Sequence, residues 1–242
     1  MGSLDEAVAL EAGGPGRWQA FADPDHESLN GMFGGWTSAV SLAAVMASAD
    51  GALRPSALTI NYLAAVAPEA RPIIHVEHLG GSRSIDHWRA DLREARSGDL
   101  QASASVVLTA RRPTEAHDQW TMPEALEPHT LDEFHAPGTQ GQQTDIRRLS
   151  GTEATYGCGD TRTSAWIRMA SERRLDHIQL AYLADQYAPR SFFWGVGLRP
   201  SATITMSVYF HATDDELAEA GTDYILNEAS GTRGSHATSG QQ

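Results

Sequence analysis

Two stretches of small and apolar residues predict buried helices, one over residues 35–50 and one over residues 175–188. In the second stretch Leu175, Ile178 and Tyr182 recur at helical spacing. The remaining faces of both stretches also carry apolar side chains. Because a helix that is apolar on most faces is buried, we expect both helices in the interior of the protein.

Strand-like segments surround these two helices. Turn signals at Pro68, at Gly80-Gly81 and at residues 97–99 separate the segments that follow the first helix, which predicts an antiparallel sheet with short loops. The expected strands are 4–10, 16–21, 57–67, 73–79, 85–95 and 100–110 around the first helix, and 161–169, 224–229 and 235–240 around the second.

A short repeat relates the two halves of the chain. The tetrapeptide RPSA follows each helix, at residues 54–57 and 199–202, and each copy leads into a strand-like run. We therefore predict an α+β fold made of two copies of one unit, a central helix wrapped by an antiparallel sheet. The expected boundaries are 1–112 for the first unit, 113–159 for a proline-rich linker with a short helix near 122–133, and 160–242 for the second unit. The counterpart of strand 100–110 is expected to be absent from the second unit.

Composition narrows the class of protein. The chain has 242 residues, a formal net charge of −13 and one cysteine, Cys158. Strong acidity argues against nucleic-acid binding, and no apolar run is long enough for a membrane span. A single cysteine excludes an internal disulfide and is typical of a reducing compartment. Together with the lack of a signal-peptide pattern at the N-terminus, this predicts a cytoplasmic protein.

Asp185 interrupts the apolar pattern of the second helix. It lies where the stripe through Tyr182 would continue, so a carboxylate is expected in buried surroundings. Burying a carboxylate is costly unless it is paired or used. A structural alternative is an aspartate that caps a loop or pairs with an arginine such as Arg190. Counting back from the RPSA tetrapeptide matches Asp185 with Val40 in the first copy, so the acid belongs to one copy only.

Three segments resemble the acyl-CoA thioesterase II (TesB-like) family, whose members have a double hotdog fold. They are NGMFGGW (30–36), LAYLADQYAPR (180–190) and SATITMSVYFHA (201–212). The resemblance implies hydrolysis of fatty acyl-CoA by a water that an aspartate, a threonine and a glutamine hold. It places the aspartate at Asp185 and the threonine at Thr203, with Thr205 as the alternative, and it places the glutamine on a final strand that this sequence does not contain. It further implies fatty acid metabolism, no cofactor, and a homodimer or higher homo-oligomer.

The chemistry of thioester hydrolysis fits these residue types. A carboxylate can take a proton from water, and unpaired N–H groups at a helix N-terminus can bind the oxygen that becomes negative. Gly34 and Gly35 at the start of the first helix allow close approach of a substrate to the backbone, although tight packing of the helix explains them equally well.

Other groups of residues give weaker indications of function. His75 and His78 lie three residues apart on an expected strand and thus on opposite faces, so we predict no metal site. Two alternative functions stay open, a non-catalytic acyl-CoA binding protein and a hydratase or dehydratase of the same fold. Several arginines could contact the phosphates of coenzyme A, namely Arg147, Arg148, Arg173, Arg174 and Arg190.

Overall fold

The first unit is built on a large antiparallel sheet. The computed structural model describes residues 3–115, 117–119, 121–151, 159–194, 201–235 and 238–241. The sheet has the strand order β1-β2-β6-β7-β8-β5-β12, and every pairing is antiparallel. Its strands are β1 (Leu10–Ala12), β2 (Arg17–Ala20), β5 (Arg54–Tyr62), β6 (Ile73–Ser82), β7 (Ile85–Arg93), β8 (Leu100–Thr109) and β12 (Thr205–Tyr209).

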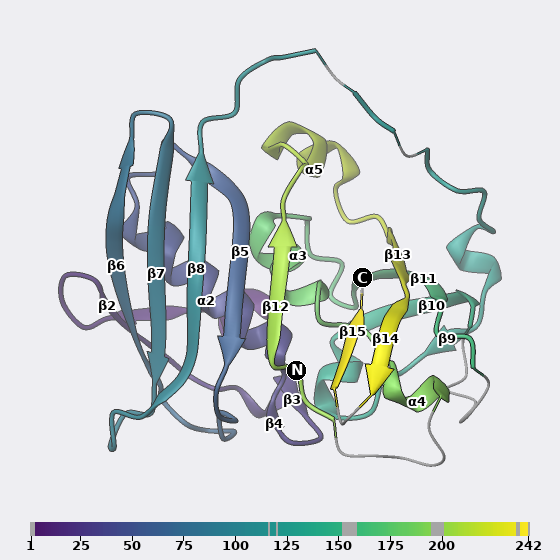
Figure 1. Cartoon of the computed structure of the whole chain (residues 1–242), viewed down its shortest axis with the longest axis horizontal. Coiled ribbons are helices and arrows are strands. Elements are labelled where there is room, and N and C mark those ends of the chain that lie inside the picture. Colours follow the sequence, from purple (N-terminus) through teal and green to yellow (C-terminus); the bar gives the residue numbers. More distant parts are fainter. Residues whose placement is uncertain are drawn as a thin grey trace.

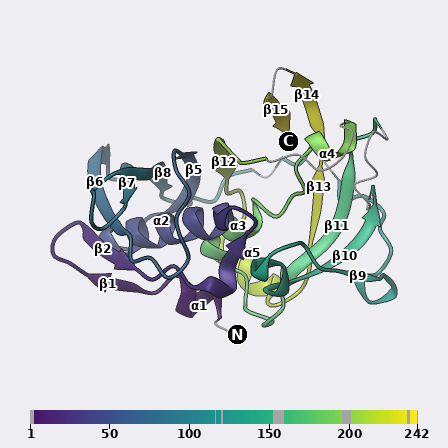
Figure 2. The ribbon, with the colours of Figure 1, turned by 90° about the horizontal axis from the view of Figure 1, so that it is seen from below.

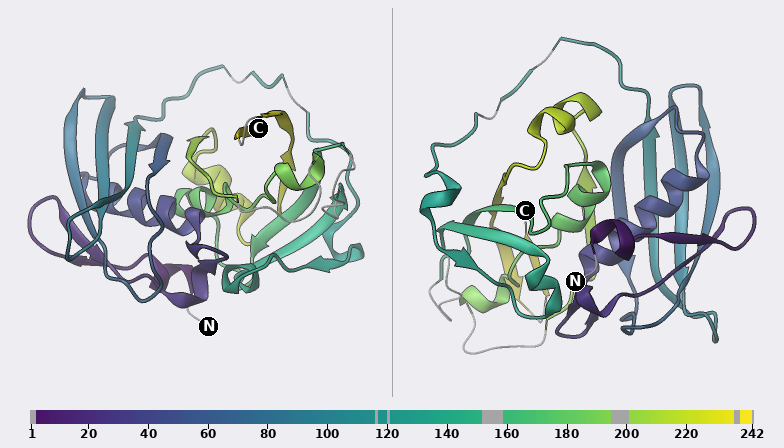
Figure 3. Two further views of the ribbon diagram at one scale, coloured as in Figure 1. Left: turned by 60° about the horizontal axis from the view of Figure 1, so that its bottom comes forward. Right: turned by 180° about the vertical axis from the view of Figure 1, so that it is seen from behind.

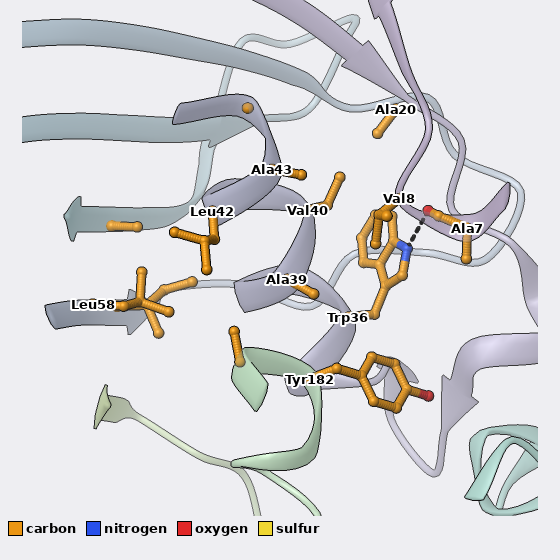
Figure 4. Packing of buried hydrophobic residues seen from close by; sticks show 14 of the residues in the cluster. Ala7, Val8, Ala20, Trp36, Ala39, Val40, Leu42, Ala43, Leu58 and Tyr182 are labelled. Atoms are coloured by element: carbon orange, nitrogen blue, oxygen red, sulfur yellow. Dashed lines mark hydrogen bonds between the residues drawn. The ribbon is translucent and has the colours of Figure 1, made fainter. Parts of the chain in front are cut away.

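Helix α2 (Gly34–Ser48) lies against the inner face of this sheet, as Figures 1 and 2 show. Every residue from Gly35 to Val45 is buried, because the sheet covers one side and the second helix and the N-terminal segment cover the others. The Trp36 indole Nε1 donates to the Ala7 carbonyl at 2.8 Å, which satisfies its polar atom inside the core (Figure 4). The apolar pattern of residues 35–50 therefore predicted this buried helix correctly.

The second unit has a smaller sheet, of strand order β13-β11-β10-β9. Its strands are β9 (Glu133–Phe134), β10 (Thr144–Ser150), β11 (Thr163–Met169) and β13 (Ile225–Ala229). A separate ribbon pairs β14 (Gly231–Ser235) with β15 (Thr238–Gln241). The central helix of this unit is α3 (His177–Leu183).

The two units join through equivalent elements. Strand β12, which follows the second helix, pairs antiparallel with β5, which follows the first, in the register Thr205↔Asn61 to Tyr209↔Ala57. Helices α2 and α3 also contact each other beneath these strands (Figure 2). The α+β class, with a central helix and an antiparallel sheet in each of two copies, is confirmed.

Several local expectations need correction. Residues 113–159 are more than a linker, because they contribute β9 and β10 to the second sheet; only the first part of this range arches between the units (Figure 3). Residues 4–10 were expected to form a strand, but α1 (Leu4–Ala7) forms instead. The side chains of Ser3 and Glu6 make a reciprocal capping box there, with Ser3 N–H donating to Glu6 at 2.8 Å.

The second helix is shorter than the expected 175–188. The helix begins only after Asp176, because the Asp176 side chain is its N-cap and accepts a hydrogen bond from Gln179 N–H at 2.7 Å. At the other end the chain leaves the helix after Leu183, so Asp185 lies in the turn that follows.

The remaining elements are short. They are η1 (Pro24–His26), β3 (Glu27–Ser28), β4 (Gly31–Met32), η2 (Pro128–Thr130), η3 (Thr139–Gln142), α4 (Ser191–Trp194) and α5 (Asp214–Ala220). The single turn η2 is all that forms of the helix expected near 122–133. Within the described ranges, no helix is long and apolar enough to cross a membrane. Cys158 and residues 199–200 of the second RPSA lie outside the described residues, and the expected absence of a counterpart of β8 from the second unit stays a prediction.

Candidate active site

Asp185 lies against the N-terminus of α2, so a carboxylate of the second unit meets the central helix of the first. The N-cap residue of α2, Phe33, makes no side-chain capping hydrogen bond. The Asp185 carboxylate lies against this N-terminus instead, where the Gly35 N–H favours its charged form. An anion at a helix N-terminus gains from both the free N–H groups and the helix dipole. This arrangement explains how an acid is accommodated where the apolar pattern of residues 175–188 would continue.

Gly34 and Gly35 make this approach possible. A Cβ on Gly34 would collide with Oδ2 of Asp185, and a Cβ on Gly35 would collide with the Tyr182 carbonyl and the Phe33 ring. Both glycines are therefore needed for close packing of α2 on the end of α3. The expected role of Gly34 and Gly35 in binding a substrate stays a prediction.

Thr203 contacts the same carboxylate. Its Oγ1 donates to Asp185 Oδ1 at 3.0 Å, and it lies just before β12. The alternative residue, Thr205, uses its hydroxyl elsewhere, donating to the Ile60 carbonyl at 3.1 Å. Thr203 rather than Thr205 thus forms a pair with Asp185, as the register of the SVYFH segment indicated.

The surroundings of Asp185 change its acidity. Burial raises its pKa to about 6, although the hydrogen bonds from Thr203 and Gly35 favour the charged form and oppose this rise. A carboxyl group with a pKa near 6 is mostly ionised at neutral pH and still basic enough to accept a proton. Such perturbed values are typical of functional acids, although structural networks produce them too.

Two further residues of the site escaped the sequence analysis. The Tyr62 Oη, at the end of β5, donates to the Gly34 carbonyl at 3.0 Å. The Ser38 hydroxyl, fully buried in α2, lies 2.9 Å from the Gly35 carbonyl and 2.8 Å from the Ala181 carbonyl of α3. A serine within an apolar helix was the available signal for Ser38. Tyr62 had none, because a tyrosine is an ordinary residue in a strand.

The arginines considered for coenzyme A are mostly engaged with other groups. Arg147 pairs with Asp145, and Arg173 pairs with Asp176 and Asp5. Arg190 is 2% exposed and donates to the carbonyls of Ala188 and Thr161 and to the Thr163 hydroxyl, without contact to Asp185 in these bonds. Arg174 donates to the Ala218 carbonyl, and Arg148 lies over the Phe134 ring. Each of the five arginines therefore has a contact within the chain, and their contact with coenzyme A phosphates stays a prediction.

The other expectations have simpler outcomes. Val40, the counterpart of Asp185 in the repeat, is fully buried in α2, so the acid occurs in one copy only. Within the described ranges, no group of three or more metal-ligating side chains is found. The glutamine implied by the family resemblance belongs to a final strand that was expected to be absent, and this expectation stays a prediction.

Comparison with known families identifies the relatives of this chain. The model of the acyl-CoA thioesterase N-terminal domain matches residues 22–111, and the model of the C-terminal domain matches residues 118–239. The chain belongs to the acyl-CoA thioesterase family. The two matches correspond to the two hotdog units, and the second begins within the range that was expected to be a linker. Comparison of the sequence with curated proteins finds no significant match.

Solved structures share the whole architecture. A conserved hotdog-fold protein of unknown function from Alicyclobacillus acidocaldarius is 29% identical, with a TM-score of 0.88 over 96% of this chain and 87% of that one. A tesB protein from Mycobacterium avium subsp. paratuberculosis is 20% identical, with a TM-score of 0.78 over 98% and 88%. The acyl-CoA thioesterase II TesB2 of Mycobacterium marinum is 16% identical, with a TM-score of 0.75 over 99% and 90%. At these two lower identities the similarity shows the fold alone.

Proposed function

We propose that this acyl-CoA thioesterase family member hydrolyses fatty acyl-CoA to a free fatty acid and coenzyme A, with Asp185 and Thr203 holding the attacking water. The observation that carries this proposal is the contact between Thr203 Oγ1 and Asp185 Oδ1 at the N-terminus of α2. The contact joins two residues that lie in segments with independent resemblance to the family. It also places the carboxylate at the junction of the two units, where one chain forms one such site.

The proposed reaction needs one proton acceptor and one nucleophile. An ionised carboxylate offers about four lone-pair positions, and the bonds from Thr203 and Gly35 occupy two of them, so a water can donate to a third. The water oxygen attacks the thioester carbonyl carbon while Asp185 accepts its proton. The C–S bond then breaks, and the coenzyme A sulfur leaves with the electron pair and takes up a proton.

The direct test is release of free thiol from a panel of acyl-CoA esters of increasing chain length. Asp185→Asn keeps the size of the side chain and removes the base, so we expect kcat/KM to fall by roughly a hundredfold or more, the usual scale for a general base. Asp215→Asn, at an exposed position on α5, is the matched control and should keep wild-type activity. Near wild-type turnover by Asp185→Asn would refute the assigned role.

The pH dependence gives a second readout of the same proposal. Since Asp185 must be ionised to accept a proton and its pKa is raised to about 6 by burial, kcat/KM should rise with pH up to about 6 and then level off. An inflection near the ordinary value of an aspartate would indicate that another group limits the reaction.

The assay also separates the two alternatives. A non-catalytic acyl-CoA binding protein would bind the esters, measured by calorimetry, without releasing thiol. A hydratase or dehydratase would change the absorbance of an enoyl-CoA without releasing thiol. The proposed homodimer or higher homo-oligomer is checked separately by sedimentation velocity.

A further inference from the structure

Tyr62 holds the first turn of α2 from the side of the sheet. Its ring packs on Gly34, where an added Cβ would lie 3.4 Å from Cε1, and its hydroxyl donates to the Gly34 carbonyl at 3.0 Å. Burial strongly raises the pKa of Tyr62, and the negative charge of Asp185 raises it further. Tyr62 therefore keeps its proton over the whole working range of pH and acts as a constant hydrogen-bond donor.

Ser38 holds the same turn from the side of α3. Its hydroxyl lies within hydrogen-bond distance of the Gly35 carbonyl and of the Ala181 carbonyl. Ala181 is in the last turn of α3, where carbonyls lack partners within the helix. The serine thus connects the start of α2 with the end of α3.

These contacts lie on both sides of the backbone that binds Asp185. The Gly34 carbonyl is fixed by Tyr62, and the N–H of the same peptide unit, that of Gly35, favours the charged form of the adjacent Asp185 carboxylate. The position of the peptide unit between the two glycines decides where that N–H points. Phe33, the N-cap residue of α2, makes no side-chain hydrogen bond that would fix this first turn.

We propose that Tyr62, together with Ser38, is a positioning residue that fixes the first turn of α2 so that the Gly35 N–H stays directed at the Asp185 carboxylate. For its effect on catalysis this inference rests on the proposed function, whereas its effect on Asp185 does not. Tyr62 is the titratable group that lies beside this turn, and its ring and the Asp185 carboxylate approach Gly34 together.

Removing the Tyr62 hydroxyl should change the titration of Asp185 in a defined direction. The Gly35 N–H stabilises the charged carboxylate, so loosening this bond favours the neutral form. We expect Tyr62→Phe to raise the titration midpoint of Asp185 by roughly 0.5 to 1 pH unit, part of what loss of a charge-assisted hydrogen bond would give.

Carbon-13 NMR of the full chain, labelled at the aspartate carboxyl carbons, measures this midpoint. Comparison with the spectrum of Asp185→Asn assigns the Asp185 signal. Tyr209→Phe removes the same hydroxyl from a tyrosine on β12 that is 68% exposed, and it should leave the midpoint unchanged. A wild-type midpoint in Tyr62→Phe, or an equal rise in Tyr209→Phe, would overturn the proposal.

Ser38→Ala is the second variant, and it keeps the test decisive if Tyr62→Phe does not fold. It removes the link between the Gly35 carbonyl and the Ala181 carbonyl, so it should raise the midpoint in the same direction. An unchanged midpoint in a folded Ser38→Ala would overturn the proposal that Ser38 and Tyr62 fix this turn together.

Kinetics supply the last arm of the experiment. If the wild-type chain hydrolyses acyl-CoA, Tyr62→Phe should lower kcat by roughly tenfold with little change in KM, and the acid limb of the pH profile should move up with the midpoint. A chain without hydrolysis would refute the proposed function alone, because the NMR titration still decides whether Tyr62 positions the Gly35 N–H. An equal change in kcat and KM with an unmoved acid limb would contradict the positioning role.

Discussion

The two units of this chain share one plan but differ in what their central helices bury. Helix α2 has 15 residues, and most of its buried side chains are apolar or small. Helix α3 has seven residues, and among its buried residues are His177, Gln179 and Tyr182. The hydroxyl of Tyr182 lies 2.9 Å from Nδ1 of His26, another wholly buried polar side chain.

This difference has opposite effects on the stability of the two units. Burying apolar side chains stabilises the first unit, at about 25 cal/mol for each Å² removed from water. Burying polar groups costs free energy unless each finds a partner. The second unit buries more charged side chains, namely Asp145 and Arg190, and burial raises the pKa of Asp185 there. The first unit contributes to the candidate site mainly backbone groups and Tyr62, which the rigid packing of α2 holds in place.

The largest expected effect tests whether the first unit provides most of the stability. Leu42 is wholly buried in α2, whereas Leu180 in α3 is only partly buried. Leu42→Ala should lower the free energy of unfolding by about 2–5 kcal/mol, the range for large cavities, and Leu180→Ala by clearly less. Urea denaturation measures both. An equal or larger loss at Leu180 would contradict the proposed difference between the units.

The second prediction concerns the cost of Asp185 itself. Its pKa rises from 3.8 to about 6 through burial, so ionisation destabilises the fold as pH rises from about 4 to 6. The cost is at most about 3 kcal/mol, from 1.36 kcal/mol for each unit. Asp185→Asn should therefore stabilise the protein at pH 8 and lose this advantage near pH 4. Melting curves at both values test this, and destabilisation at pH 8 would show that the carboxylate is structural.

Asp145 provides the opposite case in the same unit. Burial would raise its pKa, but hydrogen bonds from Arg147, Tyr224 and Arg168 more than offset this and lower it. Its contribution to stability is therefore present at neutral pH and is lost as pH falls below the ordinary value of an aspartate.

Asp145→Asn should accordingly destabilise the protein at pH 7 by about 1–3 kcal/mol, since it leaves two partly buried guanidinium groups with weaker partners. The same melting curves as for Asp185→Asn measure it, with the opposite sign expected at high pH. A stabilising effect at pH 7 would mean that the ion pairs do not offset the burial of Asp145.

The sequence predicted much of the first unit and less of the second, for physical reasons. Strands β5, β6, β7 and β8 have alternating or apolar patterns between clear turns, and all four formed near the expected positions. Strand β10 was missed because it begins with three consecutive buried residues, among them Asp145, whose burial depends on arginines of β10 and β11. Local patterns contain no information on such partners.

The residues of the candidate site were likewise predicted only in part. Asp185 was found because it breaks an apolar stripe, and Thr203 because its segment resembles a family motif. The early end of α3 was not predicted, because the turn that follows it packs Asp185 against Gly34, a residue distant in the sequence. Tyr62 was missed because its partner is a carbonyl group, Gly34 O, which every sequence has at every position.

The smallest expected effect is at Gln179, which tests whether every buried polar group of α3 matters. Its side chain is wholly buried, and its Oε1 accepts a bond of 3.3 Å from Arg173, whereas Nε2 has no hydrogen-bond partner in the described part of the chain. Gln179→Met removes that costly donor together with one weak bond, and the two changes oppose each other. We expect the free energy of unfolding to change by less than about 1 kcal/mol in urea denaturation. A loss above about 2 kcal/mol would instead show that the Gln179 amide binds an ordered water. The buried polar groups of the second unit would then be as well paired as the apolar groups of the first unit are packed.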